Sequence, residues 1–214
     1  MHKRLMIVAT LALAVVALGA SSAFGGGGRF DLYLVNSGPS SSFYNDSSSS
    51  DGNCDRTDLA SSLSTQPGTS LRQDSVGFLP DGHGPSTFSY TVPAGGGFTI
   101  PVNANAIKLK LWAYSGDGSC DGQNVNPQTI GWSLDCSGPT CGSVSLSGGG
   151  YQSITIPANT PKNTLQNVHF GVSSAVKVGA GDTISLKFTS DFYAPIQWNA
   201  PNGAGVSSLS ILTR

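Results

Sequence analysis

The most regular stretch of the chain is residues 106–114, where apolar and polar side chains alternate (Ala-Ile-Lys-Leu-Lys-Leu-Trp-Ala-Tyr). Successive side chains of a β-strand point to opposite sides of a sheet, so this stretch predicts a strand with one face in a core. The predicted core face carries Ile107, Leu109, Leu111 and Ala113. The opposite face carries Lys108, Lys110, Trp112 and Tyr114. Two aromatic rings that follow two lysines are unusual for a face that meets only solvent.

Short runs of the same kind recur along the chain, with Gly, Pro and Asn between them, and this is typical of an all-β protein. Residues 58–63 are the one segment for which we expect a short helical turn. Many short strands with uneven connections predict an antiparallel β-sandwich of jelly-roll or Greek-key topology. The predicted strands are 29–35, 76–79, 88–92, 98–102, 107–114, 128–136, 143–146, 151–156, 168–172, 175–178, 183–189, 196–198 and 206–212.

The N-terminus has the pattern of a secretory signal peptide. Lys3 and Arg4 precede an uncharged run from Leu5 to Ala20, and small residues up to Ala23 fit a cleavage site. The run is too short for a membrane helix, which needs about 20 apolar residues, and we expect no membrane span after its removal. We therefore divide the chain into a signal peptide (1–23), a glycine-rich tether (24–28) and one β-sandwich domain (29–214), and we expect the protein to be secreted or held at the cell surface.

Composition and charge exclude several functions. The 214 residues have a net charge of −1, and removal of Lys3 and Arg4 with the leader makes it −3, so no basic excess indicates nucleic-acid binding. All 12 acidic residues are aspartates, so the carboxylate pair of a glycosidase would have to come from aspartates alone. After cleavage the histidines are His83, in a turn, and His169, predicted to face solvent from a strand. No Gly-x-Ser-x-Gly motif is present. We predict a protein that is not an enzyme, with no catalytic residues.

An even number of cysteines in a secreted chain predicts disulfides. The four cysteines allow three connectivities. Cys136-Ser-Gly-Pro-Thr-Cys141 can close a tight loop through its Gly-Pro turn, and that pairing leaves Cys54 with Cys120. A zinc site is disfavoured, because the four cysteines do not form two close pairs of ligands.

Aspartates gather in two of the predicted loops. If Cys54 pairs with Cys120, the disulfide brings the two loops together, and carboxylates with loop carbonyls are the ligands that calcium takes. No established calcium-loop spacing is present, and Asp-Gly is ordinary turn chemistry, which is the favoured interpretation. Calcium is thus a candidate ion rather than an expected cofactor. The candidate ligands are Asp51, Asp55, Asp117 and Asp121.

Aromatic residues beside polar ones suggest a carbohydrate surface, because sugars stack their C–H faces on rings while amides and charged groups bind their hydroxyls. The alternative is that the rings cap the core or lie in a subunit contact. Trp132 shares its face with Ile130 and Leu134, so we predict it in the core. The candidate ligand-binding residues are Trp112, Tyr114, Lys108, Lys110 and Trp198.

The order of motifs over residues 86–212 carries one resemblance. Thr-Val-Pro-Ala-Gly-Gly at 91–96 precedes an Ile-Pro-Val strand and the long alternating strand, and Val-Gly-Ala-Gly-Asp-Thr-Ile-Ser-Leu-Lys-Phe stands at 178–188. This arrangement resembles bacterial surface jelly-roll domains of the C1q/TNF-like type, in which a Gly-Asp turn leads into a late core strand. The resemblance implies a jelly roll, a trimeric assembly and no catalytic residues. The collagen-like stalk common in such proteins is absent.

These observations together predict a non-catalytic surface or extracellular-matrix protein that acts by self-assembly or adhesion, with itself or a surface glycan as partner. Residues 29–35 are expected to pair within their own domain; addition to a neighbour's sheet, giving oligomers or filaments, is the alternative. The alternative function is a carbohydrate-binding module that uses Trp112 and Tyr114, with calcium in the aspartate loops.

Overall fold

In the computed structural model every described element is a β-strand. The structure describes residues 27–36, 61–66, 76–79, 86–113, 115, 126–150, 152–161, 164–190, 194–197 and 207–214. The strands are β1 (Gly28–Asn36), β2 (Ser61–Ser64), β3 (Val76–Leu79), β4 (Ser86–Thr91), β5 (Gly97–Ile100), β6 (Asn103–Ala113), β7 (Gln128–Gly138), β8 (Gly142–Ser145), β9 (Gln152–Ile156), β10 (Leu165–Val172), β11 (Val176–Gly179), β12 (Thr183–Ser190), β13 (Ala194–Gln197) and β14 (Ser208–Thr213).

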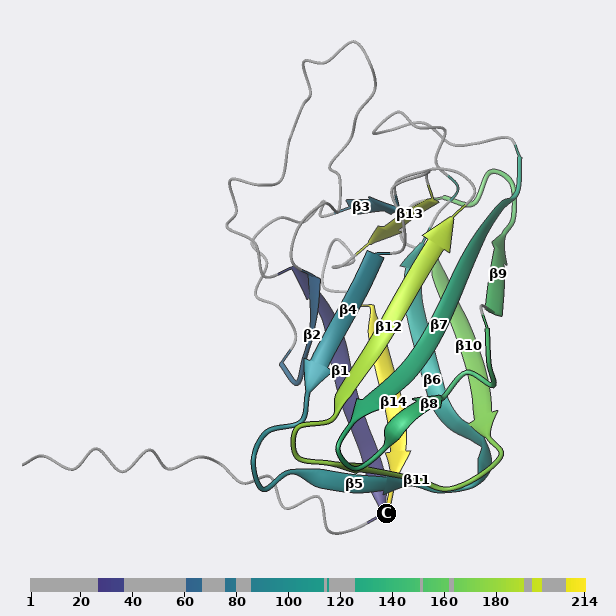
Figure 1. The fold of residues 1–214 in the computed structure, drawn as a ribbon. Coiled ribbons are helices and arrows are strands. Elements are labelled where there is room, and N and C mark those ends of the chain that lie inside the picture. Colours follow the sequence, from purple (N-terminus) through teal and green to yellow (C-terminus); the bar gives the residue numbers. More distant parts are fainter. Residues whose placement is uncertain are drawn as a thin grey trace, which may run out of the picture.

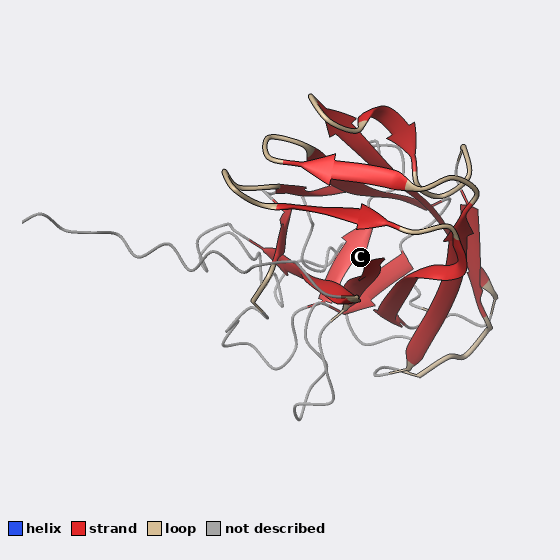
Figure 2. Ribbon diagram, turned by 90° about the horizontal axis from the view of Figure 1, so that it is seen from below, coloured by secondary structure: helices blue, strands red, loops and turns tan. Residues whose placement is uncertain are grey.

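The strands form a β-sandwich of two layers (Figures 1 and 2). The back layer of Figure 1 holds β10, β6, β14, β1 and β2, and the front layer holds β4, β12 and β7 with β8 and β9 at its edge. All registered pairs are antiparallel except a single parallel bridge between Ser62 of β2 and Ser89 of β4, which joins the layers. A separate pair, β5 with β11, lies at the bottom of Figure 1. The predicted antiparallel β-sandwich is confirmed.

The core lies between the layers, and aromatic rings connect them. Phe30 of β1 contacts Tyr90 of β4 with 5.5 Å between ring centroids, and Trp132 of β7 contacts Phe170 of β10 at 4.7 Å. Trp132 is 1% exposed, which confirms the prediction that it lies in the core with Ile130 and Leu134. Its indole N–H has no hydrogen-bond partner among the described residues.

Strands close in sequence are often far apart in the sheet. The last strand, β14, lies between β6 and β1, so the fold is not a simple meander. This crossing agrees with the expected Greek-key connections, while the jelly-roll winding stays a prediction. β1 pairs with β14 on one side and β2 on the other, so residues 29–35 pair within their own domain, as expected.

The expected helical turn at residues 58–63 is wrong where the structure describes it. Ser61–Ser64 is strand β2, and Leu63 lies opposite Leu34 of β1. Both leucines are buried, so pairing with β1 and burial override the weak local preference of a short polar segment. Residues 58–60, the predicted signal peptide and the predicted tether up to Gly26 lie outside the described residues.

Candidate functional site

Strand β6 has one apolar and one polar face, as its alternation predicts. Ile107, Leu109, Leu111 and Ala113 are fully buried. Lys110 on the other face is exposed, while Lys108 and Trp112 are half-buried. Because β6 pairs with β10 on one side and with β14 and β13 on the other, it is an inner strand of the back layer. Its polar side chains therefore have neighbouring strands on both sides and lie within the outer surface of this layer rather than at its edge.

The register of the neighbouring strands extends this surface in two rows. Residues directly opposite each other in a sheet point to the same face. One row runs across β1, β14, β6 and β10 as Asp31, Ser210, Lys108 and His169. The next row is Tyr33, Ser208, Lys110 and Asn167. We call these eight residues, together with Arg29 and Trp112, the basic face.

Arg29 belongs to this face through its hydrogen bonds. Its Nε donates to Ser210 Oγ at 2.8 Å and its Nη2 donates to the Ser210 carbonyl at 3.0 Å. Since Ser210 lies directly opposite Lys108 on the next strand, the guanidinium is held toward the lysines. The sequence alone did not indicate Arg29, because its place depends on pairing with a strand 181 residues away.

The basic face has more positive than negative charge. Arg29, Lys108 and Lys110 face a single carboxylate, Asp31, and no ion pair joins any of these four groups to another described residue. Asp31, Lys110, Asn167 and His169 are exposed, the last as predicted. The face therefore presents N–H donors and positive charge to solvent, beside the half-buried rings of Tyr33 and Trp112. It is suited to binding an extended ligand that carries oxygen acceptors.

The outer surface of the front layer differs, because its polar groups bind one another. Ser89 and Ser185 hydroxyls are 3.1 Å apart, as are those of Thr91 and Thr183. Lys187 forms an ion pair with Asp135 at 3.5 Å between Nζ and Oδ2. This surface offers no excess charge of either sign.

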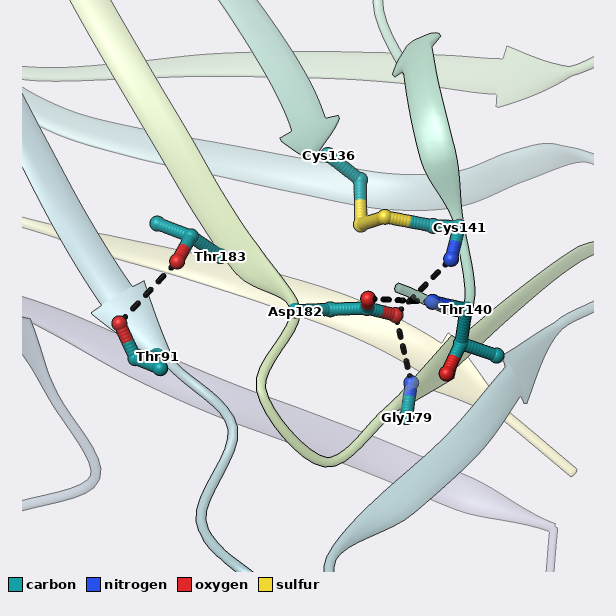
Figure 3. Close-up of a disulfide and its surroundings, with 7 residues drawn as sticks. All are labelled: Thr91, Cys136, Thr140, Cys141, Gly179, Asp182 and Thr183. Atoms are coloured by element: carbon teal, nitrogen blue, oxygen red, sulfur yellow. Dashed lines mark hydrogen bonds between the residues drawn. A yellow bond between two sulfur atoms is a disulfide. The ribbon is translucent and has the colours of Figure 1, made fainter. Parts of the chain in front are cut away.

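A second cluster lies where the β7–β8 and β11–β12 turns meet (Figure 3). The predicted Cys136–Cys141 disulfide is present, with Cα atoms 6.2 Å apart. Asp182, fully buried beside it, accepts backbone N–H bonds from Thr140 at 2.8 Å, Cys141 at 3.0 Å and Gly179 at 2.8 Å (Figure 3). We call these residues the turn cluster.

Electrostatics in the turn cluster favour the ionised carboxylate. Burial opposes ionisation of Asp182, but the bonds from Gly179, Thr140 and Cys141 outweigh it, so the pKa of Asp182 is lowered. Gly138 approaches so closely that an added Cβ would lie 2.5 Å from Asp182 Oδ1. The atoms of Cys136, Cys141 and Asp182 lie within 4.8 Å of one another. However, both sulfurs are bonded and the carboxylate is satisfied, so the cluster serves structure. The Gly-x-Gly-Asp turn was visible in the sequence, but its partners on another hairpin were not.

Several candidate residues lie outside the described part of the chain. Tyr114 and Trp198 are among them, so the structure assigns neither to the basic face. The candidate calcium ligands and the expected Cys54–Cys120 disulfide lie outside it as well; these ligands are Asp51, Asp55, Asp117 and Asp121.

Comparisons with known proteins give no assignment for this site, so its geometry alone is the basis for interpreting it. No protein-family model matches the chain, and no curated protein is significantly similar in sequence. Within the described ranges, no helix is long and apolar enough to cross a bilayer.

Proposed function

We propose that this protein is a secreted, non-catalytic surface or matrix protein that acts by adhesion through the basic face. The observation that carries the proposal is a set of three cations on the outside of a sheet, none of which has an ion-pair partner among the described residues: Arg29, Lys108 and Lys110. In a chain whose net charge is negative, concentrating unneutralised cations on one face favours contact with a partner.

Adhesion is better supported than self-assembly by strand exchange. β1 pairs with β14 through Gly28–Tyr33 and with β2 through Tyr33–Asn36, so donating it to a neighbour would first break two strand pairings. Among the described residues the only exposed large hydrophobic side chain is Val102, so that part of the surface has no apolar patch of the kind stable subunit contacts use. Trimeric assembly of the C1q/TNF-like type stays a prediction.

A carbohydrate-binding module is the second candidate, and the row that contains Lys110 favours it. Tyr33 offers a half-buried ring and Asn167 an exposed amide in this row, and the half-buried ring of Trp112 lies two residues along β6 from Lys110. Rings for stacking and amides for hydroxyls are what a sugar chain needs. Calcium-dependent binding through the aspartate loops stays a prediction.

Secretion is proposed from the leader sequence, and the disulfide supports it. The Cys136–Cys141 disulfide persists most readily in an oxidising compartment. A leader followed by a disulfide-stabilised sandwich fits a protein that works outside the cell.

Retention of the mature protein on whole cells and on insoluble polysaccharides tests the proposal. We expect retention to fall severalfold in Trp112→Ala, while Val102→Ala, which truncates an exposed apolar side chain elsewhere, leaves it unchanged. Light scattering of the same samples should show monomers at concentrations where retention is complete. Equal retention of the two variants would contradict adhesion through this face. Large assemblies in solution would contradict it as well.

A further inference from the structure

We propose that the ligand of the basic face is a carboxylate-bearing polysaccharide, with Arg29, Lys108 and Lys110 contacting its carboxylates. This inference rests on the proposed function, because it names the ligand class for the same face. It draws on three observations: the spacing of the cations, the neutral groups between them and the position of Asp31.

The cations form a compact group on β6 and β1, the two strands that flank β14. Lys108 and Lys110 are two residues apart on β6, so their Cα atoms are separated by about 7 Å along the strand. Arg29 reaches over β14 to Ser210, which lies opposite Lys108. Two of the five guanidinium N–H donors are used for Ser210, and the others stay available for a ligand. An arginine already held by two hydrogen bonds loses little freedom when it binds a carboxylate.

The neutral groups distinguish a sugar polymer from a simple polyanion. Lys110 stands between Ser208 and Asn167, and Tyr33 continues the same row. A ligand lying along this row meets a hydroxyl, a cation and an amide in succession, with aromatic rings of Tyr33 and Trp112 nearby. That order suits a chain that carries both hydroxyls and carboxylates. A polyphosphate would use only the cations.

Asp31 limits where the charges of the ligand can lie. It is exposed at the β1 end of the row that contains Lys108, two strands away, which is about 10 Å. Its carboxylate repels an anionic ligand there, so the carboxylates of the polymer are expected over β14 and β6. Removing this charge should tighten binding to an acidic polymer and leave binding to a neutral one unchanged.

The test compares polygalacturonate with its fully methyl-esterified form, which keeps the backbone and loses the charge. Calorimetry with the mature protein at low salt should show binding to the acid form about tenfold or more tighter than to the ester. Lys108→Gln/Lys110→Gln should lose about tenfold on the acid form only, while Asp31→Asn should gain about twofold. Lys177→Gln, which removes an exposed lysine from β11, is the matched control and should change affinity less than twofold. Thermal unfolding of each variant checks that the fold is kept.

The outcomes separate this inference from the proposed function. Equal binding to both polymers, unaffected by the lysine variant, would overturn the acidic ligand while leaving adhesion to glycans. Competition by inorganic polyphosphate at the same charge concentration would show that charge alone is recognised, and would overturn the assignment to a polysaccharide. Self-association that Lys108→Gln/Lys110→Gln abolishes would identify a second copy as the occupant. Failure to bind any polysaccharide or cell surface would overturn both proposals.

Discussion

Charged groups have opposite environments on the basic face and in the turn cluster. Asp182 in the turn cluster is buried and accepts three backbone N–H bonds. Lys110 on the basic face is exposed and has no partner among the described residues. A buried charge must be satisfied within the fold, because leaving it unpaired costs several kcal/mol. An exposed charge without a partner contributes little to stability and stays available for binding. The comparison predicts that changes in the cluster alter stability, whereas changes on the face alter binding.

The largest effect on stability is expected from Asp182→Asn. Two N–H donors, from Cys141 and Gly179, converge on Oδ2, and an amide group must place its own N–H₂ toward a donor. We expect a loss of about 3 kcal/mol in the free energy of unfolding, or roughly 6–12 °C in Tm. Asp135→Asn is the matched control, since that half-exposed carboxylate forms one surface ion pair and should change stability by less than about 1 kcal/mol. Equal effects of the two substitutions, measured by chemical denaturation, would contradict the comparison.

Lowering the pH should reproduce, in the unmodified protein, part of the loss of stability expected for Asp182→Asn. The pKa of Asp182 is lower in the folded state, so its contribution to stability is fully present above the ordinary aspartate pKa of about 3.9. The contribution decreases as pH falls from there through the folded-state pKa, where the carboxyl group takes up its proton. The Tm of the unmodified protein should therefore decline below about pH 4 more steeply than that of Asp182→Asn. Parallel pH profiles would show that Asp182 does not carry this dependence.

Removing the disulfide is expected to have a smaller effect. Cys136→Ser/Cys141→Ser opens a loop with a sequence separation of 5, for which chain entropy gives about 2 kcal/mol. Affinity for the polymer of the basic face should not change, because the disulfide lies in the front layer. Thermal unfolding with and without reductant checks the first expectation, and calorimetry checks the second. A loss of binding without a loss of stability would connect the two regions that the comparison separates.

The smallest effect on stability is expected from replacing the two lysines of the basic face. Lys108→Gln/Lys110→Gln removes two neighbouring like charges that have no ion-pair partner in the described part of the chain. The Tm should therefore stay within about 2 °C of the original value or rise slightly at low salt. The same variant is the one expected to lose polymer binding. A large fall in Tm would show that the lysines serve the fold, and would remove the distinction between the two regions.

Most of the architecture could be predicted from local patterns. The errors arise where pairing between segments far apart in the sequence determines the secondary structure. The alternation in residues 106–114 was enough to place Leu109 in the core and Lys110 outside. The short segment at 61–64 has no such alternation, and it becomes a strand because Leu63 can be buried opposite Leu34. Local pattern cannot reveal a partner on another strand.

The candidate site was predictable only in its central strand. Lys108, Lys110 and Trp112 follow from one alternating run. Arg29 and Tyr33 join them because β1 pairs with β14, and β14 with β6, at separations that no local rule encodes. The three amides around Asp182 likewise come from two different turns.

The position of β14 has a consequence for how the protein is made. The first described strand, β1, and strand β6 both pair with the last described strand, β14 (Ser208–Thr213). During synthesis the back layer therefore keeps two unsatisfied strand edges until β14 has been made and has paired with both. Loss of β14 alone would leave a gap between β6 and β1 in that layer, and such open strand edges promote aggregation.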